Sequence, residues 1–107
     1  MKLKIFLAAL ILGLSSNTFA VSCTEGIKKV ITDGSGNVYF TTDATCGALG
    51  WCRLNWPDPK AVDRTYTLLL TAYTTKQKVK INWTSITSCG QDNPNGTTPN
   101  YMYLEDV

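Results

Sequence analysis

Four cysteines are the feature that most constrains what this chain can fold into. Cys23, Cys46, Cys52 and Cys89 are separated by 23, 6 and 37 positions, so none of them forms the close Cys-x-x-Cys pair that is typical of zinc sites. The 107 residues include no histidine, which removes the other common zinc ligand. We therefore expect two disulfides, for which three pairings are possible.

Residues 1–20 have the three parts of a secretion signal, which are a positive start, an apolar stretch and a small-residue cleavage site. The apolar stretch, 5–14, is too short to span a bilayer, so we expect no membrane span. Cleavage after Ala20 would leave one domain, residues 21–107. Export implies an oxidising compartment, so we expect the protein to be secreted or periplasmic, with its cysteines paired.

The charge balance and the lack of histidine exclude several classes of protein. The chain carries a net charge of +2, and the two lysines of the signal account for all of it. A neutral mature domain lacks the surplus of cations with which proteins bind a phosphate backbone, so we expect no nucleic-acid partner. Ser-His and Cys-His nucleophile pairs are impossible, and the eight acidic residues are scattered, with none in an apolar run. We expect no enzyme, no cofactor and no metal.

Residue patterns predict three strands, one helix and two further strands. In chain order these are strands at 27–31, 38–42 and 51–56, a helix at 60–75, and strands at 79–83 and 101–104. The helix follows from apolar residues at three- and four-residue spacing, whereas Val79, Ile81 and Trp83 alternate with polar residues. Residues 84–100 are rich in turn formers and predict a long surface loop.

This β-β-β-α-β-β order is that of the OB-fold, a five-stranded Greek-key barrel. We expect a mainly β domain with one α-helix, closed into such a barrel and stabilised by disulfides, because so small a domain buries too little surface to leave sheet edges open. In that topology the first and fourth strands are antiparallel, which brings Cys23 close to Cys89. On this ground we favour Cys23–Cys89 together with Cys46–Cys52 over the other two pairings.

Alternation along the third strand places Cys52, Leu54 and Trp56 inside the barrel and the residues between them outside. Aromatic rings combined with amides and an arginine suit a sugar, whose C–H face stacks on rings while its hydroxyls need hydrogen-bond partners. If the third and fifth strands are neighbours, outward side chains from both, with others from the second strand and the long loop, form one ligand surface. Its members are Trp51, Arg53, Asn55, Tyr39, Tyr101, Tyr103, Asp92, Asn93 and Asn95.

Residues 74–81, Thr-Thr-Lys-Gln-Lys-Val-Lys-Ile, are similar to the helix-to-strand junction of the B subunits of bacterial A–B toxins, in the branch of subtilase cytotoxin and pertussis-like toxins. Lys76 stands where that family usually has glycine, and no residue before Cys23 matches the serine with which the family contacts sialic acid. The resemblance implies an OB-fold, glycan binding and assembly into a homopentameric ring.

Two functional hypotheses follow. The leading one is a secreted, non-enzymatic module that binds carbohydrate, with a ring-forming toxin B-type subunit as its extension. The alternative is a small periplasmic structural or protein-interaction protein, an accessory protein or an inhibitor, that uses the same outer face. Trp51 suits a ligand platform and a subunit contact equally, because exposed aromatic side chains mark both uses.

Overall fold

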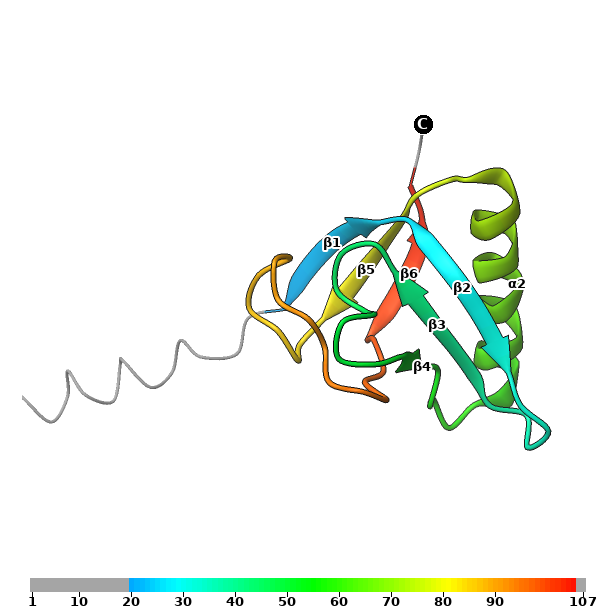
Figure 1. The fold of residues 1–107 in the computed structure, drawn as a ribbon. Helices are drawn as coiled ribbons and strands as arrows, with labels where there is room; N and C mark the ends of the chain where they lie inside the picture. Colours follow the sequence, from blue (N-terminus) through cyan, green and yellow to red (C-terminus); the bar gives the residue numbers. More distant parts are fainter. Residues whose placement is uncertain (1–19, 106–107) are drawn as a thin grey trace, which may run out of the picture.

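The computed structural model describes residues 20–105, so the expected secretion signal lies outside the described residues except for Ala20. The expectation of a mainly β protein with one helix is confirmed (Figure 1). The elements are β1 (Val21–Glu25), β2 (Ile27–Thr32), β3 (Val38–Thr42), β4 (Cys52–Arg53), α2 (Pro59–Thr75), β5 (Val79–Trp83) and β6 (Tyr101–Leu104).

The strands form two antiparallel sheets of three strands each, in the orders β1-β5-β6 and β2-β3-β4. Only Gly26 separates β1 from β2, and the chain bends there from one sheet into the other (Figure 1). The sequence prediction began the first strand at residue 27 and missed β1. The inward positions of β1 include Glu25, and a charged residue at an inward position hides the apolar alternation that identifies a strand.

Strand pairing does not close the two sheets into a barrel within residues 20–105. The neighbour of β4 is the chain just before β6: Gly96 N–H donates to the Trp51 carbonyl at 2.6 Å, and Arg53 N–H donates to the Thr97 carbonyl at 2.8 Å. We call this contact between residues 96–99 and the β4 region the seam. A proline lies on each side of these bonds, and proline has no N–H with which to extend them into a ladder.

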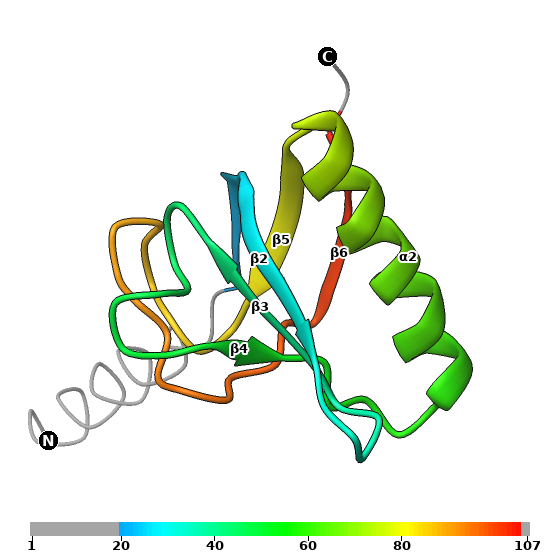
Figure 2. The same cartoon turned by 45° about the vertical axis from the view of Figure 1, so that its right-hand side comes forward.

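The core lies between the two sheets and is covered on one side by α2, which runs beside β2 and β6 (Figure 2). The third predicted strand, 51–56, is a strand only at β4, but its inward side is confirmed because Cys52 and Leu54 are buried and Trp56 is half-buried. The largest fully buried apolar side chains are those of Trp83, Phe40, Leu69, Ile81 and Val79.

The helix has a regular start and an unusual end. Asp58 caps the first turn by accepting the Lys60 N–H at 3.0 Å, and Pro59 occupies the first helical position, where its missing N–H costs nothing. The last turn ends at Lys76, whose φ of 62° lies in the left-handed region. Glycine is the residue usually found in this conformation at a helix end.

Both favoured disulfides are confirmed. Cys23 bonds to Cys89 and Cys46 to Cys52, with Cα–Cα distances of 5.6 Å and 5.8 Å. Paired cysteines are typical of proteins in oxidising compartments, which agrees with export. Within residues 20–105 no helix has both the length and the apolar character that are needed to cross a bilayer.

Candidate functional site

Trp51 points outward, as alternation predicts, and 44% of it is exposed. Its ring centroid lies 5.7 Å from that of Tyr39, at an interplanar angle of 57°. The Arg53 guanidinium carbon lies 5.9 Å from the same Tyr39 ring. Tyr39 and Arg53 are partners in the β3–β4 register, so these three side chains share the outer face of the β2-β3-β4 sheet.

An open groove of about 520 Å³ lies beside Trp51 and is called the Trp51 groove below. It extends over the β2–β3 surface, where Lys29 and Thr41 line it, and reaches Asp92 of the long loop. Lys28 and Asp43 add further charges at its wall, one of each sign. The groove therefore combines an indole wall with several hydrogen-bond donors and acceptors.

Asp43 is a fixed carboxylate at this wall. Burial raises its pKa, but the Gly26 N–H at 2.9 Å and the Lys78 ammonium at 3.3 Å together outweigh burial and hold the pKa below its usual value. The Asp43 N–H donates in return to the Gly26 carbonyl at 3.1 Å. Asp43 thus makes two hydrogen bonds to Gly26, which stabilise the bend between β1 and β2, and Lys78 balances its charge.

Arg53 supports the surface and does not line the groove. Its Nη2 donates to Asn37 Oδ1 at 2.6 Å, and the Asn37 side chain donates to Asp33 at 3.1 Å. Hydrogen bonds from Asn37, first of all from its side chain, lower the pKa of Asp33. Arg53 Nε is buried without a hydrogen-bond partner among the described residues. The arginine therefore braces Tyr39 and the turn between β2 and β3.

The structure removes Asn93 from the expected ligand surface, because this residue is 0% exposed. Its side chain accepts the Ser85 hydroxyl and donates to the Thr45 carbonyl at 3.3 Å, and its backbone N–H donates to the same carbonyl at 2.7 Å. Asn93 therefore joins the long loop to the loop after β3. Asn95 and Asn55 are exposed, but neither lines the Trp51 groove.

Tyr101 and Tyr103 lie on a different sheet from Trp51. They are 51% and 47% exposed, their ring centroids are 6.5 Å apart, and they project from the outer face of β1-β5-β6. We call them the tyrosine surface. The expected single ligand surface is thus two surfaces, because the seam joins β4 to the residues before β6 and not to β6 itself.

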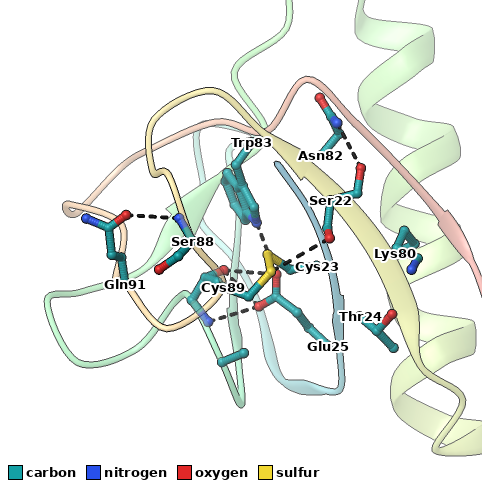
Figure 3. The surroundings of a disulfide bond; sticks show 12 residues. Ser22, Cys23, Thr24, Glu25, Lys80, Asn82, Trp83, Ser88, Cys89 and Gln91 are labelled. Atoms are coloured by element: carbon teal, nitrogen blue, oxygen red, sulfur yellow. Dashed lines mark hydrogen bonds between the residues drawn. A yellow bond between two sulfur atoms is a disulfide. The ribbon is translucent and has the colours of Figure 1, made fainter. Parts of the chain in front are cut away.

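Glu25 is a buried charged residue that sequence reasoning missed, and it does not line the Trp51 groove (Figure 3). It is 0% exposed, yet among the described residues no lysine or arginine pairs with it. Its carboxylate accepts the Thr42 hydroxyl, the Thr45 N–H at 3.0 Å and hydroxyl at 2.8 Å, and the Trp83 indole N–H at 3.0 Å. Glu25 lies in no apolar run of the sequence, as expected, yet the fold buries it completely. Glu25 follows the inward-facing Cys23 by two positions, and strand alternation therefore places Glu25 on the inward side as well.

In the described part of the chain no group of three or more metal-ligating side chains is arranged around a common point. No protein-family model matches the sequence, and no curated protein or solved structure is significantly similar to it. The function is therefore inferred from the residues and their geometry.

Proposed function

We propose that this protein is an exported, non-enzymatic module that binds carbohydrate in the Trp51 groove. One observation carries the proposal: a half-exposed indole forms the wall of a groove whose remaining lining is largely polar. An isolated exposed tryptophan would need no ligand to explain it, but one that borders a groove of small-molecule size does suggest a use.

The chemistry of the groove matches that of a sugar ring. A pyranose has an apolar C–H face, which stacks on an indole, and a rim of hydroxyls, which need both donors and acceptors. Lys29 and Thr41 can donate to such hydroxyls, and Asp92 can accept from them. The volume of about 520 Å³ lies within the usual range for small-ligand sites and is large enough for one or two sugar rings.

The strand order supports an OB-fold with an incompletely paired barrel. If β1 and β2 are counted as one bent strand, the order β6-β5-β1/β2-β3-β4 is continuous, and the seam brings its two ends together. OB-folds hold ligands over their second and third strands, beside the loop between the fourth and fifth. The Trp51 groove lies over β3 and reaches that loop at Asp92.

Lys76 supports the proposed kinship with toxin B subunits. It adopts the left-handed conformation that glycine favours, and it stands where that family usually has glycine. The same backbone geometry can therefore be present with a different residue. A homopentameric ring is the corresponding proposal for assembly, and multi-angle light scattering tests it, since a monomer at all concentrations would exclude it.

The tyrosine surface favours a second candidate, a protein-interaction role. In the β5–β6 register Tyr101 lies opposite Asn82 and Tyr103 lies opposite Lys80. The exposed Asn100 side chain donates to the buried Asn82 side chain at 2.8 Å. Exposed tyrosine with asparagine is the composition of many protein-binding surfaces. A periplasmic accessory protein or inhibitor would use this face and would not need the Trp51 groove.

A glycan array probed with the wild type, Trp51→Ala, Leu49→Ala and Tyr101→Ala separates the two candidates. Leu49 is the matched control because it lies in the same loop and is 60% exposed but does not line the groove. We expect Trp51→Ala to weaken glycan binding by at least about tenfold, with the other two variants close to the wild type. No glycan binding by the wild type, with a protein partner lost only in Tyr101→Ala, would favour the interaction role.

A further inference from the structure

Both polar backbone groups of Trp51 are held by two consecutive residues of the long loop. The Trp51 N–H donates to the side-chain oxygen of Asn95 at 3.0 Å, and the Gly96 N–H donates to the Trp51 carbonyl at 2.6 Å. These residues are 44 and 45 positions away in the sequence, so no local turn requires the contact. The peptide groups on both sides of the indole are thus fixed by one short segment.

Gly50 makes this approach possible. Its φ of 133° is one that residues with a side chain rarely adopt, and a Cβ at this position would lie 2.5 Å from Asn95 Oδ1. The Asn95 side chain therefore occupies the space that a side chain at position 50 would need. The Asn95 side chain contacts the peptide between Gly50 and Trp51, and it does not line the groove.

The loop that carries Asn95 is itself anchored at two points. The Cys23–Cys89 disulfide ties it to β1, and the Asn93 N–H donates to the Thr45 carbonyl at 2.7 Å. Cys89 and Asn93 lie six and two positions before Asn95, so these anchors fix the position of Asn95 relative to the sheets. The two hydrogen bonds from this loop to the Trp51 backbone therefore fix that backbone relative to the sheets.

We infer that Asn95 is a positioning residue for Trp51 and not a ligand contact. This inference depends on the proposed function only for its effect on binding, since the hold on Trp51 is measurable without a ligand. A freely moving indole would have to be ordered on binding, and ordering a side chain reduces affinity. Asn95 reduces that cost by fixing the backbone of Trp51 in advance.

Three variants test the hold on Trp51. Asn95→Ala removes the acceptor, and Asn95→Asp restores an acceptor oxygen at the same place. Gln91→Ala is the matched control, because Gln91 accepts the Thr87 and Ser88 N–H groups of the same loop at 2.6 Å and 3.0 Å without touching Trp51. We expect hydrogen exchange of the Trp51 amide, measured by NMR, to be about tenfold faster in Asn95→Ala and near the wild-type rate in the other two.

Binding to the glycan array provides the second measurement. We expect Asn95→Ala to bind about tenfold more weakly and Asn95→Asp to recover most of the loss. Unchanged Trp51 exchange in Asn95→Ala would overturn the inference. So would binding that is lost in both Asn95 variants while the Trp51 amide stays protected, because that result would make Asn95 a ligand contact. A wild type that binds no glycan would contradict the proposed function alone, and the exchange rates would still decide whether Asn95 holds Trp51.

Discussion

The Trp83 indole N–H donates to the Glu25 carboxylate at 3.0 Å, and both side chains are 0% exposed (Figure 3). Burial of a carboxylate is costly unless hydrogen bonds replace its water. Here the replacements come from Trp83 at the end of β5, from Thr42 at the end of β3 and from Thr45 in the loop after β3. Glu25 therefore joins three separate segments of the chain, including the loop that leads to Trp51.

Glu25→Gln is expected to destabilise the protein by about 2–4 kcal/mol. One carboxylate oxygen accepts the Trp83 indole N–H and the other accepts the Thr45 backbone N–H. Whichever way a glutamine amide turns, its NH₂ group faces one of these donors, and neither can accept a hydrogen bond. Urea denaturation at neutral pH measures the loss in the free energy of unfolding.

Glu105→Gln is the matched control, because Glu105 accepts from Thr24 at 2.9 Å and pairs with Lys80 at 3.4 Å at a partly exposed site. Water can replace either partner there, so we expect a loss below about 1 kcal/mol. Equal effects of the two substitutions would mean that the buried network of Glu25 contributes no more than a surface ion pair.

Removing the Cys23–Cys89 disulfide as a pair, by Cys23→Ala with Cys89→Ala, should cost more than removing Cys46–Cys52 in the same way. The two bridges span 66 and 6 positions, and in the chain-entropy model they stabilise by about 4 and about 2 kcal/mol. Thermal and urea denaturation of both double variants give the comparison. A larger loss for Cys46–Cys52 would show that the packing of its fully buried sulfurs outweighs loop entropy.

The elements and disulfides that could be predicted from sequence are those determined by local pattern and strand pairing. The helix has a cap, a proline and a 3.6-residue period, and β5 has strict alternation, so both were found close to their observed bounds. The Cys23–Cys89 pair follows from the antiparallel β1–β5 pairing, in which Cys23 lies opposite Ile81. The helix and β5 depend on local pattern, whereas the disulfide depends on a strand pairing that the expected topology already contains.

The parts of the site that sequence reasoning missed depend on contacts between distant segments. The tyrosine surface was joined to Trp51 because β4 was expected to pair with β6, and whether a ladder forms there depends on how residues 96–99 fit against β4. Asn93 carries an ordinary turn-forming side chain, and only its contact with Thr45 makes it interior. Neither contact leaves a periodic signal in the sequence.

Gly50→Ala should destabilise the protein by about 1–3 kcal/mol, because it combines an unfavourable φ of 133° with a Cβ placed 2.5 Å from Asn95 Oδ1. Gly34→Ala is the control, since a Cβ at Gly34 meets nothing within 4 Å and its φ lies outside the left-handed region. We expect that variant to lie within about 0.5 kcal/mol of the wild type. Denaturation midpoints measure both effects, and similar midpoints for the two variants would mean that Asn95 moves aside without cost.

The hydrogen bond from the Gly26 N–H to Asp43, together with the Lys78 ion pair, should make stability depend on pH in the acid range. Because the pKa of Asp43 in the folded protein is lowered from 3.8, its stabilising effect is complete above that unfolded value and is lost as the pH falls through the lower, folded value. The carboxylate is 42% exposed, so we expect the effect to stay below about 1 kcal/mol. Unfolding free energies of the wild type and Asp43→Asn, measured from about pH 6 to about pH 3, should converge as the pH falls. Lys78→Met, which removes one of the two partners, should show a smaller dependence than the wild type, and an unchanged dependence would assign the effect to the Gly26 N–H alone.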